Sequence, residues 1–195
     1  EQMQDWRDAA VRAVRRLRPR CLLEIGVGSG LLLRELAPDC AEYWGTDFSA
    51  PTIETLHSAV RSQPWADRVT LRTQPAHATE GLPQRYFDTV VLNSVIQYFP
   101  DAAYLLEVLR KVLPLLAPGG SIHLGDVRNQ ALLPYFAAAV ELARADGTES
   151  ADAIRERVRR ATLSERELLL APEFFTGLAG RLPGVTGVDI ELGRM

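Results

Sequence analysis

A short segment combines three glycines with an acidic residue in a pattern suited to a nucleoside-like ligand. The segment, EIGVGSG, runs from Glu24 to Gly30 and places glycine at every second position. Glycine adopts positive φ angles and has no Cβ to block a ligand, so the turn can present backbone N–H groups to that ligand. A tight turn that binds nothing is the alternative, because the turn alone does not define a ligand.

The spacing and charge of this turn discriminate between cofactor classes. A dinucleotide-binding fingerprint has the spacing G-x-G-x-x-G, which differs from the spacing here. The carboxylate of Glu24 would oppose a pyrophosphate, but it suits a ligand with an amino group and a sulfonium charge, such as S-adenosylmethionine. Glu24 could hold the turn itself or reach the ligand's amine through water. The turn therefore favours S-adenosylmethionine, with a nicotinamide-dependent reductase as the fallback.

A second acidic residue, Asp47, ends the next predicted strand. It lies about 20 residues beyond the turn, where a carboxylate can accept hydrogen bonds from both ribose hydroxyls. It could also cap the helix that begins near Pro51, and the two roles can coexist. Further on, Ala76 and His77 fall where an adenine edge is expected; Ala76 would offer backbone groups, and His77 could equally be a surface residue. The predicted cofactor-binding residues are Glu24, Gly26, Gly28, Gly30, Asp47, Phe48, Ala76, His77, Asn93 and Ser94.

These side chains are expected at the ends of strands that alternate with helices. Strands are predicted over residues 21–25, 41–48, 69–73, 87–93 and 121–126, and helices over residues 5–17, 31–36, 51–61 and 105–116. Such alternation predicts an α/β fold: a Rossmann-like, doubly wound, mostly parallel sheet with right-handed crossovers and helices on both faces.

The sequence becomes mainly helical after residue 130. Helices are predicted near 131–145, 150–162 and 172–181, followed by strand character over 185–192. We expect one domain over 1–195, with a core over 1–130 and 182–195 and a helical lid over about 131–181. The start without methionine and the end directly after an apparent strand suggest a piece of a larger multidomain protein.

Together these segments resemble a known family, the class I methyltransferase domains embedded in nonribosomal peptide synthetases, usually inside an adenylation domain. The segments LLEIGVGSG at 22–30 and YWGTDFS at 43–49 are general to class I methyltransferases. The segments VLNSVIQYFP at 91–100 and GDVRN at 125–129 are more specific, and ELLLAPEFF at 167–175 extends the resemblance over nearly the whole chain. The family continues into a final antiparallel strand, which is predicted to be missing from this chain.

The resemblance implies an activity and its partners. It implies methyl transfer from S-adenosylmethionine, leaving S-adenosylhomocysteine, to an aminoacyl group held on a carrier protein by phosphopantetheine. The usual acceptor is the α-amino nitrogen, and side-chain oxygen or sulfur is the alternative. The adjoining adenylation domain is a further implied partner. A freestanding small-molecule methyltransferase and a noncatalytic structural insert remain as rival functions.

Acceptor chemistry is expected beyond the carboxyl ends of strands four and five, where the ligand crevice of an open α/β sheet lies. An amine acceptor must present a neutral lone pair, so a proton acceptor is needed nearby. Asp126 suits that role by type, but it could instead fix its loop; Arg128 is expected to pair with Asp126 or with a helical acid. The predicted catalytic residues are Asn93, Gln97, Tyr98 and Asp126.

Two features of the predicted lid carry charge. The arginines at 155, 157, 159 and 160 could meet an acidic carrier protein, but interspersed acids favour a solvated face. Glu167 could face the acceptor pocket or be exposed.

Composition narrows the setting of the protein. The formal net charge of −3 and pI near 5.7 give no overall signal for nucleic acid. Two cysteines suit a reduced compartment, and no apolar run reaches the roughly 18 residues of a membrane span. We expect a cytoplasmic protein that binds neither nucleic acid nor membrane, and no residue is assigned to a metal.

Overall fold

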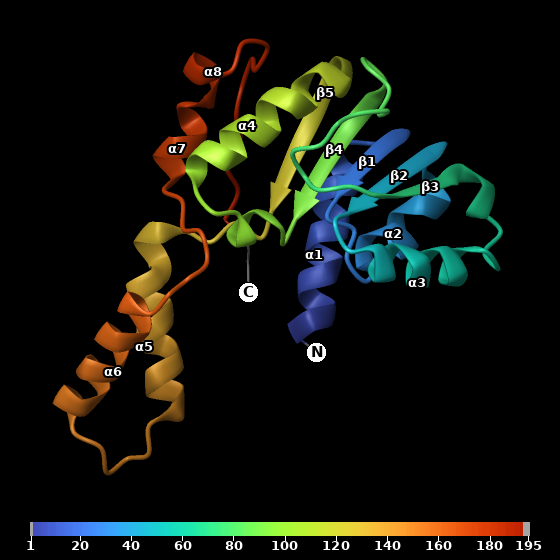
Figure 1. The fold of residues 1–195 in the computed structure, drawn as a ribbon. Coiled ribbons are helices and arrows are strands. Elements are labelled where there is room, and N and C mark those ends of the chain that lie inside the picture. Colours follow the sequence, from blue (N-terminus) through green and yellow to red (C-terminus); the bar gives the residue numbers. More distant parts are fainter. Residues whose placement is uncertain (1, 193–195) are drawn as a thin grey trace.

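A five-stranded parallel sheet organises the molecule (Figure 1). The structure, a computed structural model, describes residues 2–192 of the 195-residue chain. The strands are β1 (Cys21–Ile25), β2 (Glu42–Asp47), β3 (Val69–Thr73), β4 (Phe87–Asn93) and β5 (Leu116–Gly125). Their order in the sheet is β3-β2-β1-β4-β5, and every pair is parallel. The chain moves outward from β1 to β3 and then returns to the other side of β1, which confirms the doubly wound fold.

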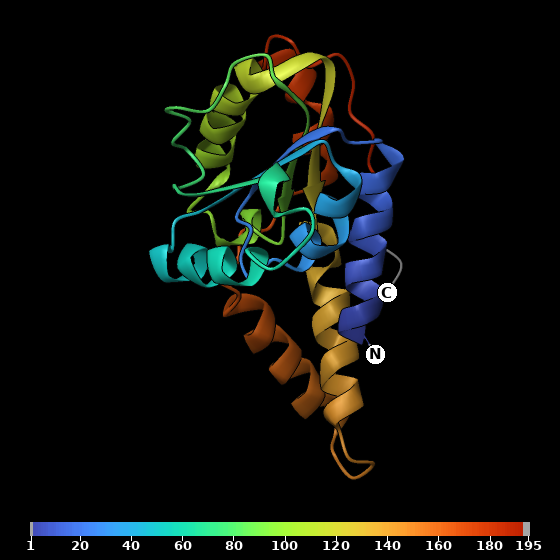
Figure 2. The same cartoon turned by 90° about the vertical axis from the view of Figure 1, so that its right-hand side faces the viewer.

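Helices cover both faces of this sheet (Figures 1 and 2). The α-helices are α1 (Gln2–Arg16), α2 (Leu31–Leu36), α3 (Ala50–Val60), α4 (Ala102–Val112), α5 (Leu133–Arg144), α6 (Ala151–Leu163), α7 (Pro172–Thr176) and α8 (Leu178–Arg181). Short 3₁₀ turns are η1 (Ala37–Asp39), η2 (Ala66–Arg68), η3 (Ile96–Tyr98), η4 (Leu113–Leu115) and η5 (Gln130–Leu132). No described helix is long and apolar enough to cross a membrane.

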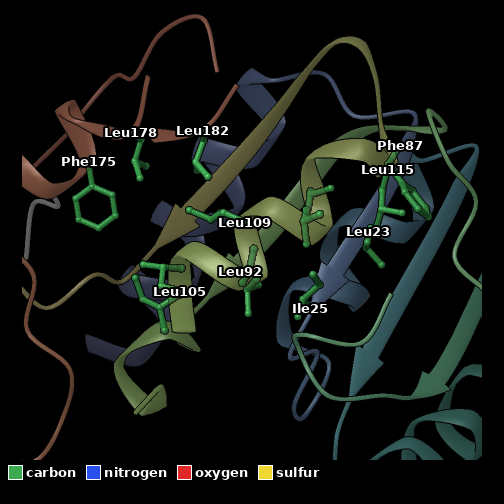
Figure 3. Close-up of a cluster of buried hydrophobic side chains, with 14 of the residues drawn as sticks. Leu23, Ile25, Phe87, Leu92, Leu105, Leu109, Leu115, Phe175, Leu178 and Leu182 are labelled. Atoms are coloured by element: carbon green, nitrogen blue, oxygen red, sulfur yellow. The ribbon is translucent and has the colours of Figure 1, made fainter. Parts of the chain in front are cut away.

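Two hydrophobic cores lie on opposite faces of the sheet, because successive strand residues point to opposite sides. In β1, Leu22 contributes to the core beneath α1, α2 and α3, whereas Leu23 contributes to the core beneath α4. Figure 3 shows the second of these, which contains Leu105 and Leu109 of α4 together with Phe175 of α7. Residues that follow the hairpin of α5 and α6 therefore complete a core begun by the sheet.

Local signals set where the helices begin. The side chain of Ser49 accepts a hydrogen bond from the Thr52 N–H and caps α3, and a proline occupies its first turn. Asp101 accepts from the Tyr104 N–H at 2.8 Å and caps α4. Because of this cap, α4 begins three residues before the predicted position at Leu105.

Strand β5 differs from the prediction at its amino end. It begins at Leu116, five residues before the predicted start at 121, and the predicted end of the preceding helix at 116 is wrong. The pairing register of β4 and β5 shifts between Phe87 and Thr89, and Gly119 has a φ of 78°. The extra residues of β5 are accommodated there as a bulge. Proline and glycine at 118–120 are typical of a turn, so composition alone does not reveal the bulge.

The strand predicted over 185–192 is wrong, because the structure has irregular backbone there. Val185 and Val188 pack against the core beneath α4, and Glu191 forms an ion pair with Arg16 of α1. No strand in the described part of the chain pairs with this segment. Alternating apolar residues form a strand only where a neighbour supplies backbone hydrogen bonds. Residues 1 and 193–195 of the predicted domain lie outside the described residues.

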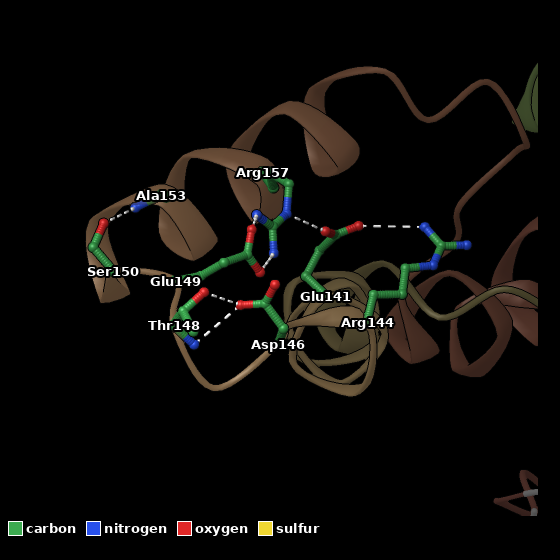
Figure 4. A network of polar contacts seen from close by, with 8 residues as sticks. All are labelled: Glu141, Arg144, Asp146, Thr148, Glu149, Ser150, Ala153 and Arg157. Carbon is green, nitrogen blue, oxygen red and sulfur yellow. Dashed lines mark hydrogen bonds and ion pairs between the residues drawn. The ribbon is translucent and has the colours of Figure 1, made fainter.

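Helices α5 and α6 form an antiparallel hairpin that projects from the carboxyl edge of the sheet (Figure 1). Figure 4 shows the polar network inside it, centred on Arg157 of α6. The Arg157 guanidinium donates to Glu141 of α5 at 2.6 Å and to Glu149 of the connection at 2.9 Å. Because Glu141 is only 8% exposed, this pairing neutralises a nearly buried charge.

A segment that we name the strap, residues 165–170, leads from the hairpin back to the sheet. Its Leu170 forms a parallel bridge with Asn129, just beyond β5. The Leu170 N–H donates to the carbonyl of Arg128 at 3.0 Å, and the Leu168 N–H donates to the carbonyl of Gln97 at 2.7 Å. The predicted lid residues thus occupy two places, a projecting hairpin and a returning segment that packs beside α4.

Candidate functional site

The glycine turn between β1 and α2 requires glycine at all three positions. Gly26, Gly28 and Gly30 have φ angles of 79°, 49° and 76°, values that residues with a side chain rarely adopt. A Cβ at Gly26 would overlap the side chain of Val95, whereas a Cβ at Gly28 would meet nothing nearer than a carbonyl oxygen at 3.9 Å. The turn therefore packs closely against the segment after β4 and leaves an open approach at Gly28.

Asp47, at the carboxyl end of β2, ties this turn to the neighbouring loop. Its carboxylate accepts from the Gly28 N–H at 3.0 Å and from the Ser49 N–H at 2.9 Å. The residue is 8% exposed. A carboxylate has about four acceptor positions, so two remain for further donors. Directly after it, the Phe48 side chain is 80% exposed.

Glu24 lies in the interior beneath the turn. It is 3% exposed, and its carboxyl group accepts a hydrogen bond from the Tyr43 hydroxyl of β2. Burial raises the pKa of Glu24 to about 8, although the bond from Tyr43 acts in the opposite direction. Burial thus favours the neutral form of this carboxyl group, whereas the sequence suggested an anion beside the ligand. Tyr43 was missed by sequence reasoning, because only the register of β1 and β2 brings it to Glu24.

The residues after β3 lie beside Asp47 at the same edge of the sheet. The Gln74 N–H donates to the Asp47 carbonyl at 2.8 Å, and the Gln74 side chain is 8% exposed with its Oε1 unpartnered. Ala76 packs against the core beneath α4. His77 is half-buried, and its Nδ1 lies 2.7 Å from the Tyr104 hydroxyl of α4. The Gln74 Nε2 donates to the Glu80 carbonyl at 3.2 Å, so only the amide oxygen is unpartnered. Gln74 and Tyr104 were not predicted, because contacts between side chains distant in sequence leave no local pattern.

The end of β4 and the turn η3 that follows it place the predicted acceptor residues at different depths. Asn93 is 8% exposed and lies against Gly125, where a Cβ would overlap its side-chain oxygen. Gln97 is 5% exposed, and its Oε1 is buried without a partner. Tyr98 instead exposes 73% of its surface. The first two can orient a bound group by hydrogen bonds, and Tyr98 offers an exposed ring and hydroxyl.

Two oppositely charged residues after β5, Asp126 and Arg128, have different partners. Asp126 is exposed, and its carboxylate accepts from the Ser94 hydroxyl at 2.6 Å. Arg128 pairs with Glu165 at 3.0 Å and Glu167 at 2.8 Å, both in the strap. The expected acidic partners of Arg128 therefore exist, but they lie in an irregular segment and not on a helix. Arg128 also lies 5.5 Å above the ring centroid of Phe136 in α5.

The arginine run on α6 pairs mainly within the hairpin, as the interspersed acids suggested. Arg155 pairs with Asp152 at 2.6 Å, and Arg159 lies 3.5 Å from Glu156. With Arg157 engaged inside the hairpin, three of these arginines have acidic partners.

Comparison with known proteins assigns the fold and its site to a family. A family model described as a methyltransferase domain matches residues 23–122, just over half of the chain. The chain belongs to this family of methyltransferase domains. The match covers the glycine turn, Asp47 and the segment from Asn93 to Tyr98, and it confirms the predicted enzyme class.

Relatives of the methyltransferase domain are segments of much longer proteins. It is 52% identical over 192 residues to CymA of Salinispora arenicola, a probable nonribosomal peptide synthetase, covering 98% of the chain and 2% of the relative. It is 42% identical over 189 residues to the chondramide synthase cmdD of Chondromyces crocatus, covering 97% and 5%. The resemblance to synthetase methyltransferase domains is confirmed, and the chain spans a small fraction of these relatives.

A solved structure shares the fold of the methyltransferase domain. The N-methyltransferase NodS of Bradyrhizobium japonicum WM9, in complex with S-adenosyl-L-homocysteine, aligns with a TM-score of 0.55. The alignment covers 77% of this chain and 72% of NodS at 17% identity. This likeness supports the Rossmann-like fold.

Proposed function

We propose that this methyltransferase domain transfers a methyl group from S-adenosylmethionine to an aminoacyl group on a carrier protein, at the α-amino nitrogen, within a nonribosomal peptide synthetase. The observation that carries the proposal is the Asp47 carboxylate, which holds the Gly28 N–H while keeping acceptor positions for a ribose. The synthetase setting rests on relatives that match nearly the whole chain.

The residues at this edge fit a nucleoside cofactor. Gly28 leaves room for a ligand, Asp47 retains two acceptor positions, and the exposed Phe48 ring offers an apolar surface for a base. Glu24 would support the turn from below, because its carboxyl group is already bound to Tyr43. Ala76 and His77 would border the base, and Asn93 and Ser94 would border the cofactor on the β4 side.

The cofactor, when bound, supplies a methyl group made reactive by a sulfonium leaving group. The protein's task is then to position the acceptor and exclude water. Asn93 and Gln97 would orient the aminoacyl group by hydrogen bonds from buried amides, and Tyr98 would pack against it. Asp126, whose side chain is exposed, would receive the acceptor's proton.

The hairpin and its surroundings would meet the partners. It projects beside the edge where the acceptor must arrive, so we assign acceptor selection to it and contact with the carrier protein to this side of the domain (Figure 1). An adenylation domain would adjoin the methyltransferase domain in the same polypeptide. Both cysteines are free thiols, which suits a cytoplasmic synthetase.

One experiment tests the proposal in the full-length protein. Calorimetric titration first measures S-adenosylmethionine binding, and mass spectrometry then follows an aminoacylated carrier protein incubated with the cofactor. We expect binding and the addition of one methyl group, which fragmentation locates on the α-amino nitrogen. A methyl group on side-chain oxygen or sulfur would redirect the assignment. Absence of cofactor binding by the folded protein would leave a structural insert as the function.

A further inference from the structure

Two neighbouring strands of the sheet end in residues with a left-handed backbone. Ser94, directly after β4, has a φ of 55°, and Asp126, directly after β5, has a φ of 58°. Neither is glycine, so each conformation costs on the order of 1 kcal/mol and must be held by its surroundings. Arg18 and Arg85, the other two such residues in the described chain, precede β1 and β4 at the opposite edge of the sheet.

The unusual backbone brings a hydroxyl and a carboxylate together. The Ser94 hydroxyl donates to Oδ2 of Asp126 at 2.6 Å, and the Ser94 N–H donates to the Gly125 carbonyl at 3.1 Å. On the inner side, Nδ2 of Asn93 lies 3.5 Å from the Ser94 hydroxyl oxygen. A hydrogen-bonded path therefore runs from the buried amide of Asn93 through Ser94 to the exposed carboxylate of Asp126.

This path lies beside the cofactor turn. Ser94 directly precedes Val95, whose side chain occupies the position of a Cβ at Gly26. Other acids near this edge have other tasks: Glu24 is buried against Tyr43, and the two strap carboxylates pair with Arg128. Asp47 holds the Gly28 and Ser49 N–H groups, and the proposed function assigns its remaining acceptor positions to the ribose. Asp126 is thus the carboxylate that connects the buried site to solvent.

We propose that Ser94 and Asp126 form a proton relay that converts the acceptor ammonium into the nucleophilic amine; this rests on the proposed function. The acceptor N–H donates its proton to the Ser94 Oγ as the hydroxyl proton passes to Oδ2 of Asp126. The freed lone pair of the amine attacks the methyl carbon, and the carbon–sulfur bond breaks with its electron pair remaining on sulfur. Asp126 then releases its proton to water. Ser94 would therefore be a catalytic residue beyond the cofactor contact predicted for it.

The test compares Ser94→Ala, Asp126→Asn and the double variant in the full-length protein at neutral pH. Asparagine tolerates the left-handed backbone and can still accept the Ser94 hydrogen bond, but it is not a base. We expect each single change to lower kcat by about tenfold to a hundredfold. Because both residues act on one proton, the double variant should be no slower than the slower single variant. Cofactor affinity from calorimetry should stay within about twofold for Asp126→Asn, whose side chain the proposed function places on the acceptor's proton and not on the cofactor.

Two further measurements separate the relay from a structural bond. Ser94→Gly removes the same hydroxyl as Ser94→Ala but has no Cβ to strain the positive φ, so it should match the low kcat of Ser94→Ala and yet melt at a higher temperature than Ser94→Ala. The deficit in kcat of Ser94→Ala and Asp126→Asn relative to the native protein should shrink at alkaline pH, where the acceptor amine is already neutral. Arg128, the nearest cation along the chain, stays neutralised by Glu165 and Glu167 in each variant.

The outcomes distinguish the relay from the function on which it rests. Native kcat in Ser94→Gly, or multiplicative losses in the double variant, would overturn the relay while methyl transfer itself persists. A native protein that does not methylate the carrier-bound aminoacyl group would instead overturn the proposed function.

Discussion

At the scale of single residues, one carboxylate performs two backbone tasks and leaves room for a third. Asp47 holds the Gly28 N–H of the glycine turn and the Ser49 N–H at the start of α3. The two roles that the sequence allowed for Asp47 are therefore not exclusive, since the loop bond is present and acceptor positions remain. Such sharing makes the geometry of the turn dependent on this side chain.

Replacing Asp47 tests that dependence. Asp47→Ala removes the ribose acceptors and releases the Gly28 N–H, and hydrogen bonds to a charged group are each worth about 1.5–3 kcal/mol. We expect cofactor affinity to fall by at least about tenfold in calorimetric titration. Ser49→Ala is the matched control, because it weakens the cap of α3 but leaves the carboxylate in place. Equal affinity of native protein and Asp47→Ala would remove Asp47 from the site.

The buried Glu24 predicts a pH-dependent stability. Its pKa rises from 4.5 to about 8 on folding, so between these values the folded protein keeps a proton that the unfolded chain has lost. Stability from this group is thus fully present below pH 4.5 and is lost as pH rises toward 8, by up to about 1.4 kcal/mol per pH unit. Glu24→Gln mimics the protonated group and should abolish this decline. Denaturant unfolding of both proteins at pH 6 and pH 9 measures it; parallel declines would contradict the prediction.

Site residues could be predicted where the type and spacing of residues indicate their chemical role. The glycine turn and Asp47 belong to this group, because positive φ angles and strand ends leave a pattern in the chain. Tyr43 could not be predicted, because the register of β1 and β2 brings it to Glu24. Gln74 could not be predicted, because only the structure shows that its buried oxygen has no partner. The charge state of Glu24 was likewise hidden, since burial decides it.

At the scale of elements, the strap ties the hairpin to the site by backbone and charge. Leu168 bonds to the carbonyl of Gln97, and Arg128 pairs with Glu165 and Glu167. Hairpin side chains meet each other more than the sheet, as the network around Arg157 illustrates (Figure 4). The hairpin can therefore change without disturbing the glycine turn.

Replacing residues 133–163 by a short glycine–serine linker tests this separation. We expect the full-length variant to bind S-adenosylmethionine with native affinity and to lose methylation of the proposed carrier-bound substrate, because the hairpin to which acceptor selection is assigned is gone. Calorimetry and mass spectrometry measure the two effects separately. Arg155→Ala is the control that keeps the hairpin, and it should leave both properties near native because its ion pair is exposed. Retained methylation after the replacement would exclude the hairpin from acceptor selection.

Elements bounded by clear apolar runs were predicted with their observed limits, as for β1, β3 and β4. The prediction failed at the start of β5 and over 185–192. In both places strand formation depends on a pairing partner: β4 extends β5 through a bulge, and the described chain offers no partner to the later segment. Local composition does not encode a partner distant in sequence.

At the scale of the whole molecule, the two cores depend on different parts of the chain. Residues up to Val91 build the core beneath α1, α2 and α3, whereas the other core needs Phe175, Leu178 and Leu182 as well (Figure 3). Residues 175–182 are thus part of the folding unit, although they follow a projecting hairpin.

A matched pair of leucine substitutions tests this organisation. Leu182 is 1% exposed, so Leu182→Ala should lower the free energy of unfolding by about 2–5 kcal/mol. Leu163, at the end of α6, is 76% exposed, and Leu163→Ala should change it by less than about 0.5 kcal/mol. Denaturant unfolding measures both. Similar losses would show that the hairpin belongs to the core, and negligible losses would show that the returning segment does not.

The bridge between Asn129 and Leu170 has a consequence for how such domains diversify. The chain leaves the sheet near Asn129 and returns to it at Leu170, and these two residues are adjacent. The hairpin between them is therefore an insertion with neighbouring ends. Exchange of the hairpin between homologous domains, with both bridge residues kept, would leave the glycine turn and Asp47 unchanged. Recombination at the ends of the hairpin would then change the acceptor without changing the residues proposed to bind the cofactor.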